Sequence, residues 1–92
     1  MSKVEFMAGY YEWNIYIDGN HFYTFGDGIG EDIQKDTTYS DLESVAEEYI
    51  DMMNIDLQTN DKEMLEDEEI KAELKKQMID KWSYHFGISK AA

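Results

Sequence analysis

The distribution of acidic residues is the strongest constraint on how this 92-residue chain can fold. Seventeen of its 21 aspartates and glutamates lie between Asp27 and Glu73, a stretch with three lysines and therefore a charge of −14 (3 − 17). The whole chain has eight lysines, no arginine and a net charge of −13. Charge at this density repels itself and destabilises a compact state. We therefore expect these carboxylates to point outward together and to serve a function other than folding.

Length and composition indicate one globular domain spanning residues 1–92. Apolar residues make up 42% of the chain and aromatic residues 14%, which argues against a disordered acidic segment. The absence of cysteine excludes a disulfide framework and a thiolate metal site. No apolar run approaches the ~18 residues of a membrane helix, and the first residues lack the pattern of a secretion signal. We expect a soluble cytoplasmic protein.

Residues 10–25 are predicted to form a β-hairpin, because aromatic and β-branched residues dominate them. Trp13, Ile15 and Ile17 alternate with Asn and Tyr, which is the period of a half-buried strand. Residues 4–8 are a candidate for an earlier strand. That strand would complete a three-strand antiparallel meander.

The Asp-Gly-Asn turn at residues 18–20 sets the register of this hairpin. A two-residue loop would place Phe22 and Thr24 on the face that carries the apolar residues of the first strand. A three-residue loop would place Tyr23 and Phe25 there instead. We expect the three-residue loop, because burying two aromatic rings removes more apolar surface from water.

Residues 42–53 carry the clearest helical pattern of the chain. Apolar residues recur there at i, i+3, i+4, i+7, i+8 and i+11, the spacing of one face of an α-helix. They are Leu42, Val45, Ala46, Tyr49, Ile50 and Met53. Ser40 followed by Glu43 fits a capping box and predicts where the helix begins. Asn54 predicts where it ends.

A second helical region is expected after Asn60, which can cap it, and an apolar stripe continues from there to residue 86. The acidic triplet at residues 67–69 either lies inside one long helix or begins a separate final helix. Gly87 is the expected C-terminal stop. The predicted fold is therefore α+β: a small antiparallel hairpin or three-strand meander followed by two or three helices packed on one face.

Carboxylates three or four residues apart on a helix lie roughly 5–6 Å from one another. Phosphates recur every ~3.4 Å along a DNA strand, and the arginine and lysine groups that bind phosphate also bind carboxylate. The acidic rows could therefore occupy the nucleic-acid groove of a basic protein. The alternatives are a solvated face that keeps the protein soluble and an adaptation to high salt. The candidate partner-binding residues are Asp27, Glu31, Asp32, Asp36, Asp41, Glu43, Glu47, Glu48, Asp51, Glu63, Glu66, Asp67, Glu68, Glu69 and Glu73.

Several other functions are disfavoured by the residues present. Direct binding to nucleic acid or to an anionic membrane needs cations that the middle of the chain lacks. Residues 27–32 fail the EF-hand spacing because Ile29 occupies the third position, and residues 54–65 lack the required glycine and glutamate. His21 and His85 join no nucleophile pattern. We predict no cofactor, no dedicated metal site and no enzymatic activity.

Small size, strong acidity, absence of cysteine, a small sheet and acidic helices together resemble the phage-encoded DNA-mimic inhibitors, such as anti-CRISPR and antirestriction proteins. The resemblance implies a non-catalytic inhibitor that occupies the DNA or PAM cleft of a CRISPR or restriction nuclease in the cytoplasm of a bacterial host. CRISPR nucleases read the PAM partly through arginines, for which carboxylates compete. A second hypothesis is a protein-interaction or regulatory module that uses an aromatic sheet face, with Tyr16 and Phe22 as contacts.

Overall fold

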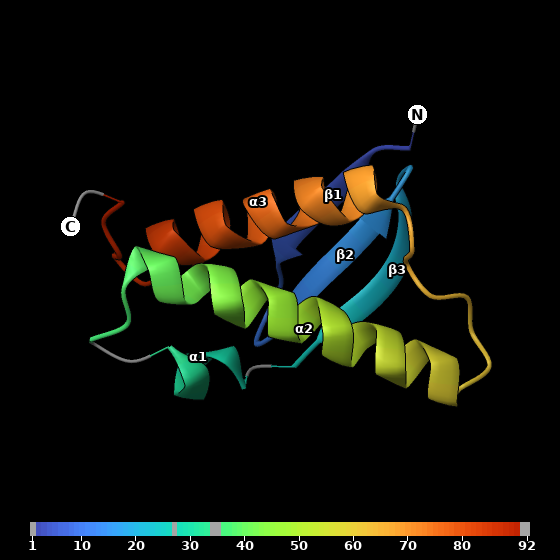
Figure 1. Ribbon diagram of the computed structural model, residues 1–92, viewed down its shortest axis with the longest axis horizontal. Helices are drawn as coiled ribbons and strands as arrows, with labels where there is room; N and C mark the ends of the chain where they lie inside the picture. Colours follow the sequence, from blue (N-terminus) through green and yellow to red (C-terminus); the bar gives the residue numbers. More distant parts are fainter. Residues whose placement is uncertain (1, 27, 34–35, 91–92) are drawn as a thin grey trace.

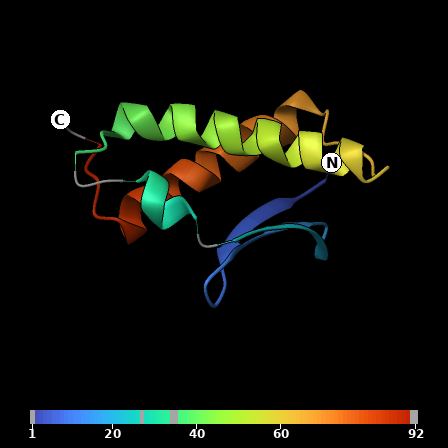
Figure 2. The ribbon, with the colours of Figure 1, turned by 90° about the horizontal axis from the view of Figure 1, so that it is seen from below.

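The computed structural model describes residues 2–26, 28–33 and 36–90, and has an α+β fold (Figure 1). The described elements are β1 (Val4–Ala8), β2 (Trp13–Ile17), β3 (Asn20–Phe25), α1 (Ile29–Asp32), α2 (Tyr39–Thr59) and α3 (Glu68–His85). The strands form one antiparallel sheet in the order β1-β2-β3. Figure 2 shows α2 and α3 on the same side of this sheet. The predicted fold class is confirmed, with the three-strand meander as its sheet.

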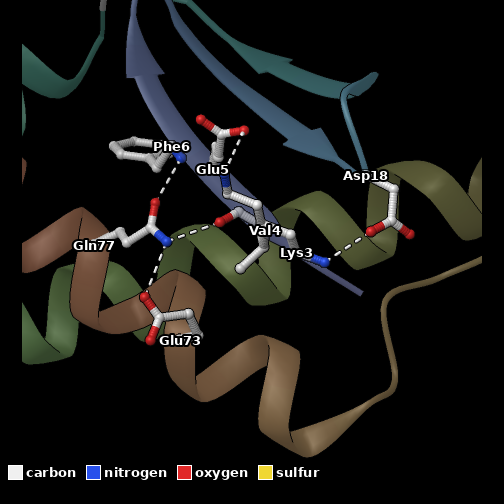
Figure 3. Close-up of polar contacts among 7 residues, drawn as sticks. All are labelled: Lys3, Val4, Glu5, Phe6, Asp18, Glu73 and Gln77. Carbon is white, nitrogen blue, oxygen red and sulfur yellow. Dashed lines mark hydrogen bonds and ion pairs between the residues drawn. The ribbon is translucent and has the colours of Figure 1, made fainter. Parts of the chain in front are cut away.

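The turn between β2 and β3 has two residues, so the predicted three-residue loop is wrong. Ile17 pairs directly with Asn20, and the loop between them consists of Asp18 and Gly19. Both loop residues have positive φ, 52° and 81°. Positive φ at both central residues is the geometry of a type I′ turn, whose twist matches that of the flanking strands. Asp18 further closes this end of the sheet by accepting a 2.8 Å hydrogen bond from the backbone N–H of Lys3 (Figure 3).

A β-bulge restores the expected face of β3. Ile15 pairs with Tyr23 while the next residue, Tyr16, pairs with His21, which leaves Phe22 as the extra residue. Beyond the bulge the alternation of β3 is shifted by one position. Tyr23 and Phe25 therefore lie against the core, as predicted, although the loop that was expected to place them there is absent.

The helix α2 begins earlier than the capping signal at Ser40 and Glu43 predicted. Thr38 is the N-cap: its hydroxyl accepts a 3.1 Å hydrogen bond from the backbone N–H of Asp41. The Asp41 carboxylate in turn accepts a 2.9 Å hydrogen bond from the backbone N–H of Thr38. This reciprocal pair is a capping box that satisfies two backbone donors at the start of the helix.

The same helix continues beyond its predicted end at Asn54, and Asn60 caps its C-terminus instead of starting the next helix. Asn54 lies inside the helix, and its side chain bonds another segment. The Asn54 Oδ1 accepts a 2.8 Å hydrogen bond from the Leu65 N–H, and the Nδ2 donates a 3.0 Å bond to the Leu65 carbonyl. Asn54 therefore fixes the segment 61–67, which joins the two long helices.

The acidic triplet at residues 67–69 begins a separate helix, α3. The Asp67 carboxylate is the N-cap and accepts hydrogen bonds from the backbone N–H groups of Glu69, at 2.9 Å, and Ile70, at 3.2 Å. At the other end Gly87 has a φ of 68°. The backbone N–H of the following residue bonds the Ser83 carbonyl at 2.8 Å, which completes a Schellman motif. The predicted stop at Gly87 is confirmed.

Aromatic rings join the helices to the sheet in the core. Phe6 of β1 and Trp13 of β2 stack with ring centroids 5.1 Å apart. Trp82 of α3 is fully buried and meets both rings edge-on, at 5.6 and 6.4 Å. Tyr49 of α2 contacts Trp82 at 5.4 Å. Trp82 is thus the residue at which the sheet and both long helices meet, although its Nε1 has no hydrogen-bond partner among the described residues.

The free edge of β1 is covered by one side chain of α3. The backbone N–H of Phe6 donates a 2.8 Å hydrogen bond to Gln77 Oε1, and Gln77 Nε2 donates a 2.8 Å bond to the Val4 carbonyl (Figure 3). Gln77 Nε2 also lies 2.9 Å from a carboxylate oxygen of Glu73, one helical turn away. The Gln77 amide therefore imitates a neighbouring strand and fixes α3 against an edge that would otherwise be open to pairing.

Candidate partner-binding surface

The outer face of α2 presents a row of carboxylates. The buried residues of this helix form a single stripe toward the core, namely Leu42, Ala46, Tyr49, Ile50, Met53 and Leu57. All five acidic residues predicted to bind a partner from this helix are exposed: Asp41, Glu43, Glu47, Glu48 and Asp51. Because the apolar stripe fixes the rotation of α2, these five side chains point away from the core, as expected.

The density of charge on this face is close to that of one DNA strand. Asp41 and Asp51 are ten residues apart, which corresponds to about 15 Å of helix at ~1.5 Å per residue. A DNA strand places roughly four phosphates in that length, at ~3.4 Å each. The helix offers five carboxylates over the same distance and contains no lysine.

A second group of exposed carboxylates lies where α2 ends and α3 begins. Its members come from the joining segment and the first turns of α3: Glu63, Glu66, Asp67, Glu68, Glu69 and Glu73. A groove of about 360 Å³ between the two helices connects this group with the outer face of α2. Glu47 and Asp51 line it from α2, and Glu68 lines it from α3. Glu69 and Glu73 instead line a hollow beside Val4, and Glu63 and Glu66 line one beside Phe22. We call the two groups together the acidic surface.

Lysines of α3 neutralise part of this groove. Lys75 Nζ lies 2.6 Å from a carboxylate oxygen of Glu47, and Lys71 Nζ lies 3.5 Å from one of Glu68. Within the described residues, no ion pair joins the other carboxylates of the acidic surface. The lysines therefore neutralise negative charge only at the contact between the helices, and the outermost row of α2 stays negative.

Some of the predicted site residues also stabilise the fold. The backbone N–H of Thr38 bonds the Asp41 carboxylate and holds the pKa of Asp41 below its usual value. Asp67 caps α3. Asp32 accepts a 2.6 Å hydrogen bond from the Tyr49 hydroxyl, and burial of that phenol, together with this bond, raises the pKa of Tyr49 above its usual value. These carboxylates are held in fixed positions by their hydrogen bonds.

The short helix α1, which lies in the predicted acidic loop, is on the other side of α2 from α3 (Figure 1). Asp32 and Asp36 are exposed, whereas Asp27 and the side chain of Glu31 lie outside the described residues. This loop was predicted to be a flexible connector, but it packs on the core. Ile29 and the residue four positions later, Ile33, are both buried, and that spacing was the available signal for a helical turn.

Asp56 and Asp61 were absent from the predicted set and are also exposed. Asp56 accepts a 2.7 Å hydrogen bond from the Tyr23 hydroxyl, which connects α2 to β3. Burial and this carboxylate raise the pKa of Tyr23 to about 12. Asp56 therefore has a role in the fold, and its position in the acidic run was the only signal that the sequence offered for it.

The aromatic sheet face of the second hypothesis differs from its prediction. Tyr16 is half-buried on the face of the sheet away from the helices and lies edge-on to His21 at 5.8 Å. Phe22 instead packs against the core, because the bulge turns it toward Met64 and Ile70. The most exposed aromatic residues lie elsewhere, in the β1–β2 turn and near the end of α3.

Among the described residues, no three histidine, aspartate or glutamate side chains are grouped so that they could hold a metal ion. Nor is any helix in this part of the chain both long and apolar enough to cross a membrane. Comparisons with protein-family models, with curated proteins and with solved structures find no match to this chain.

Proposed function

We propose that this protein is an acidic, non-catalytic inhibitor that binds the DNA cleft of a bacterial defence nuclease, such as a CRISPR effector, in place of DNA. The observation that carries the proposal is the outer row of α2. Five exposed carboxylates occupy about 15 Å there, and Glu47 alone among them has a lysine partner within the described residues. A surface of this charge density suits arginines and lysines that would otherwise hold phosphates.

The two parts of the acidic surface would contribute differently to binding. Carboxylates at the centre of the contact, such as Glu43 and Asp51, would become desolvated against arginines and so control the rate of dissociation. Carboxylates at the periphery, such as Glu63 and Glu66, would speed association through long-range attraction. Binding should therefore weaken as salt rises, as it does for the DNA that the protein replaces.

A competition assay tests the proposal directly. A fluorescent DNA duplex is bound to each member of a panel of purified guide-loaded CRISPR nucleases and restriction endonucleases, and the acidic protein is added. We expect displacement of the duplex from at least one nuclease, weakening between about 0.05 and about 0.3 M NaCl. If no member of the panel releases its DNA at micromolar protein, the proposed function is wrong.

Charge reversal identifies the face responsible. Glu43→Lys combined with Asp51→Lys changes two carboxylates that have no ion pair among the described residues, so neither ion pair of Lys71 or Lys75 is removed. We expect about 100-fold weaker competition. The control is Glu5→Lys combined with Asp80→Lys, which changes the net charge equally outside the acidic surface. Equal losses from both double variants would show that net charge alone acts, which contradicts a specific mimic.

A protein-interaction module that uses aromatic residues is the second candidate function. Its supporting observation is that Tyr10 and Tyr11 are 84% and 71% exposed. Tyrosine is enriched at protein interfaces, and contacts of this kind depend little on salt. Substituting both tyrosines by serine would abolish binding under this hypothesis and would leave competition with DNA unchanged under the first.

A further inference from the structure

The turn between β1 and β2 is tight and strained. The backbone N–H of Gly9 donates a 2.7 Å hydrogen bond to the Glu12 carbonyl, which closes the turn. A Cβ added to Gly9 would lie 2.8 Å from side-chain atoms of Asn14 and Glu12, so another residue there would force these side chains to move. Tyr11 has a φ of 64°, in the left-handed region that disfavours large side chains. Strain of this kind tends to collect where a structure positions side chains for function.

The strained turn presents two aromatic rings to solvent. The ring centroids of Tyr10 and Tyr11 lie 4.3 Å apart, and both side chains are largely exposed. Figure 2 shows the β1–β2 turn extending away from the long helices. Apolar rings held in contact with water and with each other are typical of a surface that is covered by a partner.

A pocket of about 270 Å³ lies beside this turn, between it, α1 and the end of α3. The aromatic and titratable side chains that line it are Tyr11, Glu12, Trp13, His85 and Phe86. Its wall is preorganised by ring packing: His85 lies edge-on to Trp13 at 5.5 Å and to Phe86 at 4.8 Å. The volume lies below the ~300 Å³ at which small-molecule sites begin, so it suits a single side chain better than a cofactor.

We propose that this pocket binds an arginine side chain of a partner protein. A guanidinium stacks on aromatic faces and donates paired hydrogen bonds to a carboxylate, and the exposed Tyr11 and Glu12 offer those groups together. An ammonium lacks the planar fork, so lysine fits this combination less well. The chain has no arginine of its own and a net charge of −13, so the occupant comes from another molecule and is attracted to this one.

The arginine pocket is separate from the acidic surface. Its lining residues come from the β1–β2 turn, the start of α1 and the end of α3, and none of them belongs to the outer row of α2 or to the segment 61–67. The inference therefore goes beyond the proposed function. It can be tested on the isolated protein with a small probe, whatever the competition assay shows.

Nuclear magnetic resonance gives a residue-specific test. The ¹⁵N-labelled protein is titrated with Nα-acetyl-arginine amide in about 0.15 M NaCl, which screens attraction beyond ~8 Å. We expect saturable shift changes at the Glu12 amide and the Trp13 indole, with a Kd on the order of 1–10 mM. The lysine analogue should bind at least roughly threefold more weakly. Absence of saturable changes in the pocket up to about 50 mM arginine probe would overturn the proposal.

Three variants distinguish specific binding of the arginine probe in the pocket from nonspecific attraction of a cation to an acidic protein. Glu12→Gln removes the carboxylate, and Tyr11→Asn removes a ring while keeping a residue that tolerates the left-handed backbone. Each should weaken the arginine probe by about fivefold or more. The control Asp80→Asn removes one negative charge outside both the pocket and the acidic surface and should alter the Kd by less than about twofold. The proposal is overturned if Asp80→Asn has the same effect as Glu12→Gln. The spectra of the variants also report whether each remains folded.

Discussion

α2 and α3 have similar lengths and lie in the same layer, yet their charges differ completely. α2 carries six acidic residues and no lysine, a charge of −6. α3 carries four acidic residues and four lysines, which cancel. In α3 the polar side chains contact the rest of the molecule: Gln77 bonds β1, and Lys75 bonds Glu47 of α2. In α2 the outer carboxylates of Glu43, Glu48 and Asp51 are exposed and have no ion pair among the described residues.

This difference separates charge that folds the protein from charge that is available to a partner. A carboxylate with an internal partner, such as Asp41 or Asp67, stabilises a helix end. Glu43, Glu48 and Asp51 have no such partner among the described residues. If the comparison is right, substitutions in α3 should mainly change stability, whereas substitutions on the outer face of α2 should mainly change binding.

The largest expected effect is that of Trp82→Ala in α3. Trp82 is fully buried and touches rings of β1, β2 and α2. Its removal should lower the free energy of unfolding by about 3–5 kcal/mol, out of a total of roughly 5–14 kcal/mol for a chain of this length. The control Met52→Ala removes a side chain of α2 that is 51% exposed and should change stability by less than about 0.5 kcal/mol. Urea unfolding followed by circular dichroism measures both, and comparable losses would contradict the comparison.

The link from α3 to the sheet edge should have the next largest effect. Gln77→Leu removes both hydrogen bonds to β1 and leaves the Phe6 N–H and the Val4 carbonyl without their partner (Figure 3). We expect a loss of about 1–3 kcal/mol and faster hydrogen exchange at the Phe6 amide. Gln58→Leu is the matched control, because Gln58 is exposed on α2. If Phe6 exchanges equally slowly in both variants, Gln77 does not protect the edge.

Local patterns predicted the elements of this fold better than their boundaries and connections. The apolar stripe of residues 42–53 is local, and it placed α2 correctly. Thr38 with Asp41 and Ser40 with Glu43 both fit the capping pattern, and the one that forms lies closer to the N-terminus. The bulge at Phe22 and the bond from Gln77 to β1 depend on which segments meet in space. A linear pattern does not contain that information.

The candidate site was predictable to a similar extent. Because the apolar residues of a helix face the core, the exposure of Glu43, Glu48 and Asp51 follows from the sequence. The pairing of Lys75 with Glu47 joins residues 28 positions apart and appears only when the helices pack. The arginine pocket was not anticipated either, since it combines the β1–β2 turn with the end of α3.

The start of α2 provides a smaller test, because there one acidic residue of α2 does act in folding. Thr38→Ala should destabilise the protein by about 1 kcal/mol. The pKa of Asp41 is lower in the folded protein than its ordinary 3.8, so its contribution is fully present above that pH. It is lost as the pH falls below 3.8 through the folded pKa. The stability difference between wild type and Asp41→Ala, which removes the carboxylate, should therefore shrink at low pH, and a difference that stays constant would exclude the carboxylate from the cap.

The smallest expected effect, that of Glu48→Gln, tests the difference in charge between α2 and α3 most directly. Glu48 and Asp51 lie one helical turn apart on α2, and like charges at this spacing repel by about 0.2–0.5 kcal/mol. Glu48→Gln should therefore raise the free energy of unfolding by about that amount at low salt. The gain should vanish near 1 M NaCl, where screening acts within ~3 Å.

The same change in α3 should have the opposite sign. Glu68→Gln removes the partner of Lys71, which lies 3.5 Å away, and exposed pairs of this kind contribute about 0–1 kcal/mol. Thermal or urea unfolding at two salt concentrations distinguishes the two variants. Stabilisation by Glu48→Gln but not by Glu68→Gln would mean that the carboxylates of α2 oppose folding. Their presence would then be explained by binding to a partner. Stabilisation by both would mean that the two helices carry equivalent charge, and the argument from α2 to a binding surface would fail.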